Sequence, residues 1–198
     1  LLVAWFLPWT HHILEIIDFT VFAILNQSLT LSDTWMMFWG YLNHPEENWI
    51  NIVVMVALNI TAIMLLDKSN RKRALGIFLY CWLSFQLILL LTHFIFSDIL
   101  HITRHSPSMI ITPFLKLSEA MQNPEIKDYS FSSFPAGHTL VAIYWALFAG
   151  LYAPNKIKAM IYCLAVLLCL PRVFSGAHWI SDIVFTILYA AICFYVMV

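Results

Sequence analysis

The chain has 198 residues, of which 62% are apolar and 11% charged, with a net charge of −1 and a mean hydropathy of +0.82. Soluble domains carry about 25% charged residues, so this composition indicates an integral membrane protein. The near-neutral charge gives no general attraction to nucleic acid or to an anionic surface. All four cysteines lie in apolar runs and show no zinc or disulfide pattern, which leaves the redox compartment open: Cys81, Cys163, Cys169 and Cys193.

Long apolar runs along the chain predict membrane-spanning helices. They are continuous rather than alternating, which favours helices over barrel strands. Five runs approach the roughly 20 residues that cross a bilayer: 49–66, 74–96, 138–153, 157–171 and 180–198. The first residues, LLVAWFLPW, are expected to be the end of a further span that is truncated at its N-terminus. We therefore expect an all-α membrane protein, a six-helix transmembrane bundle forming a single domain over residues 1–198.

Residues 10–48, which follow the first expected span, have a more mixed composition. Apolar residues recur there at near-helical spacing between Ile13 and Leu25. This pattern predicts an amphipathic helix lying in the outer membrane interface. Three tryptophans are expected to act as headgroup-level anchors: Trp35, Trp39 and Trp49.

Basic residues divide the connections between the runs into two sets. Six lie in the connections DKSNRKR and APNKIK: Lys68, Arg71, Lys72, Arg73, Lys156 and Lys158. Because cytoplasmic loops are enriched in lysine and arginine, both connections are expected to face the cytoplasm. Residues 97–137 and the turn at 172–179 then share the opposite side of the membrane.

Three short segments on that opposite side carry charged or titratable side chains, whose cost near a membrane points to function. They are ITRHSPS with Arg104, SFPAGHT with His138, and PRVFSGAHWISD with Arg172, His178 and Asp182. His178 and Asp182 are four residues apart, so on a helix they share one face. The aspartate can then accept the proton of one imidazole nitrogen and leave the other nitrogen as a nucleophile.

Small residues beside these charges indicate anion binding. Residues 175–177 form a tight turn in which backbone amides and the Arg172 guanidinium can converge on one anion. In FPAGH, Pro135 and Gly137 make a tight entry to a helix that begins near His138, and helix N-terminal amides favour phosphate. His138 is then placed to protonate a departing oxygen.

In order and spacing, the three segments resemble the motifs of the type 2 phosphatidic acid phosphatase family of membrane phosphatases and phosphotransferases. The third motif, arginine, five residues, histidine, three residues, aspartate, is matched in full: Arg172, His178 and Asp182. The second, Pro-Ser-Gly-His, appears with Ala136 in place of serine. The first, lysine, six residues, Arg-Pro, is partly present, because Arg104 fits while Ser97 occupies the lysine position and the proline is Pro107.

This resemblance implies a double displacement that needs no metal or other cofactor. His178 attacks phosphorus to form a phosphohistidine, Asp182 steadies its charge, and His138 protonates the leaving group. The phosphate oxygens are held by residues of all three motifs: Arg104, Arg172, Ala136 and Gly137. The absent motif lysine removes one phosphate contact, which Lys116 or Lys127 can supply, although their spacing does not decide it.

Within the family, RHSP, SFPAGH and PRVFSGAHWISD are similar to bacterial inner-membrane enzymes that act on lipid A. The resemblance implies transfer of a phosphate from undecaprenyl pyrophosphate to the 1-phosphate of lipid A at the periplasmic face, with these two lipids as partners. A lipid phosphatase shares the phosphohistidine step but releases inorganic phosphate. Its substrate would be undecaprenyl pyrophosphate, lipid A 1-phosphate or phosphatidylglycerol phosphate, and the motifs leave both activities open.

Three other interpretations use the same residues. A structural polar cluster would have its arginine anchored to headgroups and its aspartate capping a helix. A non-catalytic phospholipid-binding or transport protein needs the arginines, but has no need of two histidines and a histidine-orienting aspartate. A zinc hydrolase would use several histidines, although no glutamate neighbours them as in His-Glu-x-x-His and the arginines repel a cation: His101, His105, His138 and His178.

Overall fold

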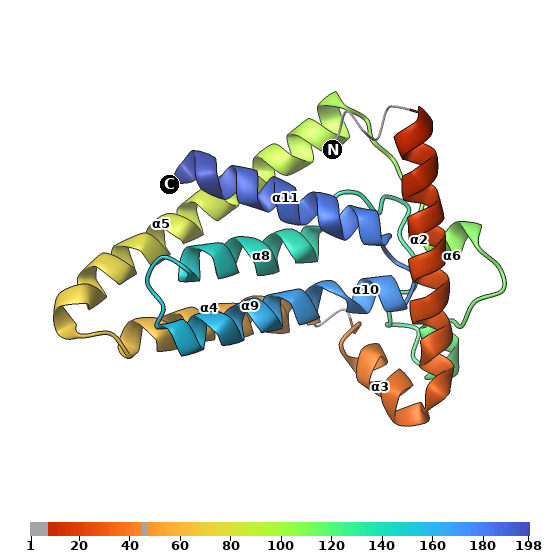
Figure 1. The fold of residues 1–198 in the computed structure, drawn as a ribbon, viewed down its shortest axis with the longest axis horizontal. Coiled ribbons are helices and arrows are strands. Elements are labelled where there is room, and N and C mark those ends of the chain that lie inside the picture. Colours follow the sequence, from red (N-terminus) through yellow and green to blue (C-terminus); the bar gives the residue numbers. More distant parts are fainter. Residues whose placement is uncertain (1–7, 45–46) are drawn as a thin grey trace. The chain divides into compact units, whose positions relative to one another are not determined.

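The computed structural model describes residues 8–44 and 47–198, and within these ranges it contains helices and no strand (Figure 1). The expected all-α class is therefore confirmed for the described part of the chain. The chain forms two compact units. Unit 1 comprises Leu1–Glu47, Thr103–Ala136 and Leu170–Thr186, and unit 2 comprises Asn48–Ile102, Gly137–Cys169 and Ile187–Val198. Residues 1–7, which begin the expected first span, lie outside the described residues.

Unit 1 is built from short helices around one long helix. Its elements are α2 (Pro8–Ser28), η1 (Leu29–Leu31), α3 (Asp33–Tyr41), α6 (Pro107–Ile110), α7 (Leu117–Ala120), α10 (Pro171–Phe174) and the first residues of α11 (Ile180–Met197). The N-termini follow local rules. Ser32 accepts a 3.1 Å hydrogen bond from the Trp35 amide and caps α3, and Pro107 and Pro171 open α6 and α10.

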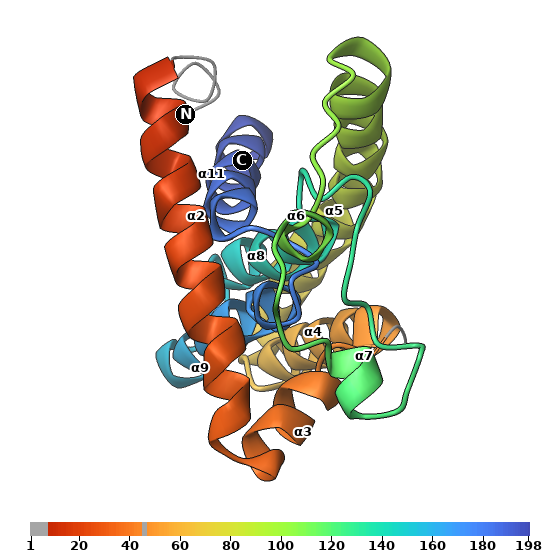
Figure 2. The same cartoon turned by 90° about the vertical axis from the view of Figure 1, so that its right-hand side faces the viewer.

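The core of unit 1 is aromatic. α2 packs against η1 and α10, while α3 packs against α7 and α10 (Figures 1 and 2). The ring of Trp39 stacks on Phe174 with centroids 3.9 Å apart, and Phe22 of α2 is also fully buried. Trp39 is only 3% exposed, so core packing rather than headgroup anchoring accounts for it. The Trp49 side chain lies outside the described part of the structure.

Unit 2 consists of long apolar helices. It contains α4 (Glu47–Met64), α5 (Lys68–His93), the π-helix η2 (Phe94–Ile99), α8 (Gly137–Ala149), α9 (Asn155–Cys169) and the later part of α11. The first residue of α4, Glu47, is counted with unit 1. α8 packs between α5 and α9, and most of its side chains are buried. Buried polar groups pair across helices, as where the Tyr144 hydroxyl donates to Ser84 Oγ at 2.8 Å. Such pairing satisfies polar groups that lipid cannot.

Four helical segments are long and apolar enough to cross a membrane by length and composition: Trp9–Leu31, Lys68–Ile99, Asn155–Phe174 and Ile180–Met197. Two further apolar stretches are shorter: Gly137–Ala149, and Ile52–Met64, which lies within the 18-residue helix α4. Every predicted run therefore forms a helix, although α8, in the run 138–153, has only 13 residues. The long helix over residues 8–28 has the length of a span, whereas the sequence predicts an interfacial helix there; the interfacial placement stays a prediction.

The basic connections lie at one end of unit 2. The turn between α4 and α5 and the turn between α8 and α9 are at the same end of this unit (Figure 1). Arg71 also closes the C-terminus of α4, because its guanidinium donates to the carbonyl oxygens of Leu66 at 2.8 Å and Met64 at 2.6 Å. Both turns are therefore rich in lysine and arginine and lie at the same end of unit 2, as expected for connections on the same side of a membrane.

Single cysteines at Ser69 and Asn155, both exposed beside these two turns, test that arrangement. In sealed inverted and right-side-out vesicles, a membrane-impermeant thiol reagent is expected to label both cysteines in the same orientation of the vesicle. Permeabilised vesicles, in which both sites become accessible, are the control. Labelling of the two sites from opposite sides would contradict the arrangement of the basic turns.

Candidate active site

Three chain segments of unit 1 are joined by backbone hydrogen bonds. The amide of Ser133 donates to the carbonyl of Arg104 at 2.7 Å, and that of Ser106 donates to Ser130 at 3.1 Å. The amide of Ser108 donates to the carbonyl of Gly176 at 3.2 Å. The segment around Arg104 is thus held between the residues preceding FPAGH and the turn of PRVFSGAHWISD. Backbone hydrogen bonds alone therefore join segments that are far apart in the sequence.

His178 is buried, with 6% of its surface exposed. Its Nδ1 lies 2.5 Å from the carbonyl oxygen of Ser133 and 3.8 Å from the Asp182 carboxylate. A carbonyl oxygen only accepts hydrogen bonds, so Nδ1 carries the proton and Nε2 carries the lone pair. The sequence predicts that Asp182 fixes this tautomer, but the nearer acceptor in the structure is the backbone carbonyl of Ser133.

Asp182 is fully buried and stands in the first turn of α11. Its Oδ2 accepts a 3.0 Å hydrogen bond from the amide of Trp179, the residue just before the helix. A side chain in the first turn that accepts a hydrogen bond from the N-cap amide is one of the two interactions of a capping box. The partial positive charge of the helix N-terminus also stabilises the negative charge of Asp182. Its other oxygen, Oδ1, is ion-paired with Arg104.

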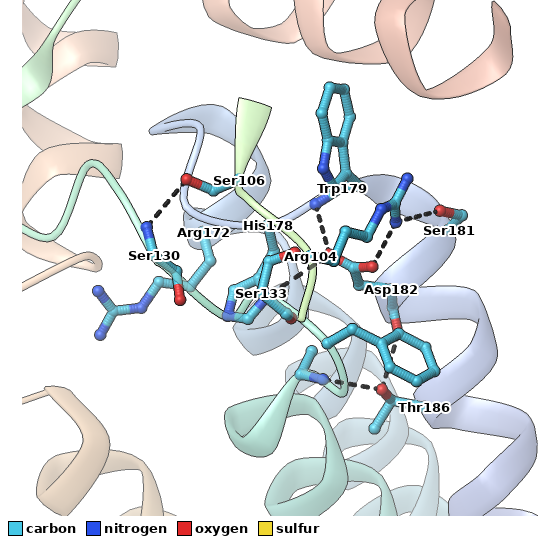
Figure 3. A network of polar contacts seen from close by, with 12 residues as sticks. Arg104, Ser106, Ser130, Ser133, Arg172, His178, Trp179, Ser181, Asp182 and Thr186 are labelled. Atoms are coloured by element: carbon cyan, nitrogen blue, oxygen red, sulfur yellow. Dashed lines mark hydrogen bonds and ion pairs between the residues drawn. The ribbon is translucent and has the colours of Figure 1, made fainter. Parts of the chain in front are cut away.

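Arg104 joins two carboxylates, those of Asp18 and Asp182, and Figure 3 shows its contact with Asp182. Its Nη1 donates to Asp182 Oδ1 and, at 2.9 Å, to Ser181 Oγ, while its Nη2 donates to Asp18 Oδ2 at 2.6 Å. The guanidinium also lies over the ring of Trp179, 5.0 Å from its centroid, as in a cation–π contact. One positive charge is therefore shared between two acidic side chains.

Asp18 is the site residue that sequence reasoning missed. It is 1% exposed and accepts hydrogen bonds from the Ser181 amide at 2.9 Å and the Ser181 hydroxyl at 2.6 Å. One signal was available, because an aspartate surrounded by apolar residues in IIDFTVF is costly in a membrane helix without a partner. Sequence alone does not say that Arg104 is that partner.

The turn from Arg172 to His178 is locked by its own backbone. The carbonyl of Arg172 accepts hydrogen bonds from the amides of Ala177 at 2.9 Å and His178 at 3.0 Å. Gly176 has φ of +85°, and a Cβ there would lie 3.0 Å from the Phe22 ring and 3.1 Å from Ser108. The turn therefore requires glycine on two grounds, conformation and space.

Arg172 is 2% exposed, and its Nη1 donates to the carbonyl of Asn43 at 3.4 Å. Figure 3 shows its guanidinium on one side of His178 and that of Arg104 on the other. The two predicted phosphate-binding arginines therefore flank the histidine rather than converging beside each other.

The second motif straddles the two units. Ala136, in unit 1, is buried, and its amide donates to Thr186 Oγ1 at 3.0 Å, so this amide already has an acceptor. Gly137 is the first residue of α8, and a Cβ atom added to it would have no described atom of the surrounding structure within 4 Å. In unit 2, Nε2 of the half-buried His138 lies 3.4 Å from both the Cys169 carbonyl and the Thr139 hydroxyl.

Ser133 contributes a second polar group besides its carbonyl. Its hydroxyl is buried and has no hydrogen-bond partner among the residues that the structure describes. In the same ranges, no group of three or more His, Cys, Asp and Glu side chains is arranged to hold a metal ion. The four histidines of the zinc interpretation are thus not gathered into a ligand set there.

Comparison with known proteins assigns the family. The family model of the PAP2 superfamily matches residues 88–198, more than half of the chain. The chain belongs to the PAP2 superfamily. This confirms the resemblance drawn from the motifs, and with the apolar helices it identifies a multi-pass membrane protein of a superfamily of phosphatases and phosphotransferases.

Three relatives extend the match beyond the family region. Lipid A 1-diphosphate synthase of Escherichia coli (strain K12) is 25% identical over 188 residues, covering 93% of this chain and 76% of that protein. The fold is similar to the crystal structure of Aquifex aeolicus LpxE, with a TM-score of 0.56 and 21% identity over 91% of this chain and 93% of that one. It also resembles a transmembrane PAP2-type phosphatidylglycerolphosphate phosphatase from Bacillus subtilis, with a TM-score of 0.50, 19% identity and coverage of 98% and 87%.

Asp18→Ala is expected to be destabilising. It removes the acceptor of hydrogen bonds from Arg104 and from the amide and hydroxyl of Ser181, and a buried donor left without its acceptor costs about 1–3 kcal/mol. We expect a corresponding fall in the free energy of unfolding, measured in detergent. Glu15→Ala, one turn earlier on α2, is the matched control, because its exposed contact with His11 contributes about 0.5 kcal/mol or less. Equal stability of the two variants would contradict the role of Asp18.

Proposed function

We propose that this protein transfers a phosphate from undecaprenyl pyrophosphate to the 1-phosphate of lipid A through a phosphohistidine on His178. The observation that carries the chemistry is the buried imidazole whose Nδ1 faces the Ser133 carbonyl, inside a complete arginine–histidine–aspartate motif. The choice of substrates is supported by the relative named lipid A 1-diphosphate synthase, which aligns with 93% of the chain.

In the first step, Nε2 of His178 attacks the terminal phosphorus of the diphosphate. The bond from that phosphorus to the bridging oxygen breaks, and undecaprenyl phosphate leaves as His138 gives a proton to the departing oxygen. The Asp182 carboxylate lies 3.8 Å from Nδ1, where it stabilises the positive charge that develops on the ring. The Ser133 carbonyl keeps the ring oriented throughout.

In the second step, an oxygen of the lipid A 1-phosphate attacks the phosphohistidine. The phosphorus–nitrogen bond breaks, the 1-diphosphate forms, and His178 regains its lone pair. If water attacks instead, the products are inorganic phosphate and the free enzyme, which is the lipid phosphatase alternative. The difference lies in whether the site excludes water while it admits a second lipid.

The substrates also set the proposed location and architecture. We place the protein in the bacterial inner membrane as a single catalytic domain with six spans, interfacial helices on the outer side, and the active site facing the periplasm. The clustering of basic residues in the turns of unit 2 supports this orientation. The helices α4 and α8 would be the fifth and sixth spans, with the 13-residue α8 in a locally thin part of the membrane.

Following a labelled phosphate tests the reaction directly. Purified protein is incubated with undecaprenyl pyrophosphate labelled on its terminal phosphate, with and without lipid A, in excess EDTA. We expect the label to move to lipid A despite the chelator. Label found only as free phosphate would establish a lipid pyrophosphatase, loss of activity with EDTA would favour a metal-dependent hydrolase, and no release would favour a binding protein.

His178→Ala is expected to lower phosphate transfer to background and to abolish acid-labile labelling of the protein, because no other nucleophile replaces Nε2. The fold is expected to persist, as judged by thermal unfolding in detergent. His12→Ala, at an exposed position of α2, is the control and is expected to retain full labelling. Transfer at a near-normal rate in the His178 variant would overturn the assignment of the nucleophile.

A further inference from the structure

Asp18 of α2 contacts the first turn of α11 directly. Its Oδ1 accepts a hydrogen bond from the Ser181 amide at 2.9 Å, and its Oδ2 accepts one from the Ser181 hydroxyl at 2.6 Å. Ser181 immediately precedes Asp182 in the chain. A buried carboxylate 163 residues away in the sequence from Ser181 therefore holds the backbone next to the aspartate of the third motif.

Asp18 also reaches Asp182 by a second route, through Arg104. Nη2 of Arg104 donates to Asp18 Oδ2 at 2.6 Å. Nη1 of the same guanidinium donates to Asp182 Oδ1 and, at 2.9 Å, to Ser181 Oγ (Figure 3). Because a guanidinium is planar and its donors have fixed directions, a carboxylate bound at one nitrogen orients the other. The position of Asp182 therefore depends on where Asp18 holds the guanidinium.

Two groups that face Nδ1 of His178 are tied to Arg104. The Asp182 carboxylate, 3.8 Å from Nδ1, is ion-paired with its guanidinium. Ser133, whose carbonyl lies 2.5 Å from Nδ1, donates its amide to the backbone carbonyl of Arg104 at 2.7 Å. A shift of Arg104 would thus be felt on both sides of this nitrogen, by the group that orients the ring and by the group that stabilises its charge.

The charge of Asp18 has a further effect on the imidazole. At 3.8 Å the Asp182 carboxylate lies beyond hydrogen-bond distance from Nδ1, so it acts on the ring through its charge, and this interaction weakens with distance. Arg104 opposes it, because a nearby positive charge disfavours a positively charged ring. The negative charge of Asp18 offsets part of the charge of Arg104. Neutralising Asp18 therefore disfavours the phosphorylated ring, whatever other groups surround the site.

We propose that Asp18 is a positioning residue of this active site, which acts through Arg104 and Ser181 to keep Asp182 at the distance from His178 that formation of the phosphohistidine requires. The inference rests on the proposed function for the phosphohistidine step, but not for the identity of the lipid. Because Asp18 acts on the aspartate and not on the substrate, its loss slows the chemical step and leaves substrate binding nearly unchanged.

Steady-state transfer by the full chain in detergent tests this role. Asp18→Asn keeps the size of the side chain and removes its charge. With labelled undecaprenyl pyrophosphate and lipid A, it is expected to lower kcat about 10-fold to 100-fold, the effect of misplacing a reacting group by about 1 Å, with KM within a few-fold of the parent. Glu15→Gln, the same chemical change at a more exposed position one turn earlier on α2, is the matched control and is expected to keep the parent's kcat.

A double-mutant cycle separates positioning from a general loss of stability. If Asp18 acts through Asp182, it has little left to act on once Asp182 is replaced. In an Asp182→Asn background, Asp18→Asn is therefore expected to slow single-turnover labelling of His178 by about 2-fold or less. A merely structural role predicts that the effects of the two changes multiply. Multiplying effects, or an unchanged kcat in Asp18→Asn alone, would overturn the proposal.

Ser181→Ala is the second variant, for the case in which Asp18→Asn does not fold. It removes the hydroxyl that accepts from Arg104 and donates to Asp18, and it leaves the hydrogen bond from the Ser181 amide to Asp18 in place. We expect kcat to fall several-fold with KM unchanged, and thermal unfolding in detergent checks that each variant is folded. Folded Ser181→Ala with the parent's kcat would then contradict the positioning role.

Phosphoramidate, a small phosphoryl donor, separates failure of this inference from failure of the proposed function. Nε2 of His178 attacks its phosphorus, the phosphorus–nitrogen bond breaks, and ammonia leaves, so no lipid is needed. If the wild type and Asp18→Asn transfer phosphate between the lipids equally fast, the function stands and the role of Asp18 falls. If neither transfers, but phosphoramidate labels His178 more slowly in Asp18→Asn than in Glu15→Gln, the positioning role stands and the proposed reaction falls. A wild-type His178 that neither donor labels would overturn both.

Discussion

A single guanidinium held between two buried carboxylates determines how this site is built. Asp18 and Asp182 are excluded from water, and a buried carboxylate without a countercharge costs several kcal/mol in a low-dielectric environment. Arg104 satisfies both, and it comes from a segment whose backbone is bonded to residues 130–133. The long helix α2, the loop segments and the start of α11 therefore share one electrostatic centre, and the position of each depends on the other two.

This arrangement gives His178 two unlike surroundings. One side presents Asp182, which is ion-paired with Arg104 and lies 3.8 Å from the ring. The other side presents the guanidinium of Arg172. In the proposed reaction, Asp182 stabilises the positive charge of the phosphorylated ring and keeps its contact with Arg104, while Arg172 binds the phosphate.

The sequence predicts those parts of the site that local spacing decides. The tight turn of small residues at 175–177 is predicted, and Gly176 has φ of +85° there. His178 and Asp182 are also neighbours as predicted, with 3.8 Å between Nδ1 and the carboxylate, but His178 lies just before α11 and not on a shared helix face. The apolar runs likewise predict the helices, though not that α8 is only 13 residues long. Asp18 could not be assigned because its partner is 86 residues away, and the Ser133 carbonyl could not because a backbone oxygen leaves no trace in the sequence.

The order in which the partners of Arg104 are synthesised has a consequence for biogenesis. Asp18 emerges 86 residues before Arg104, an interval of roughly 4–17 s at ordinary rates of translation. During that interval Arg104, the partner of Asp18 in the folded protein, has not yet been made, so α2 is expected to hold this group protonated or at the membrane surface. Asp182 follows later still. The centre around Arg104 is therefore complete only after residue 182 has been synthesised, long after Asp18.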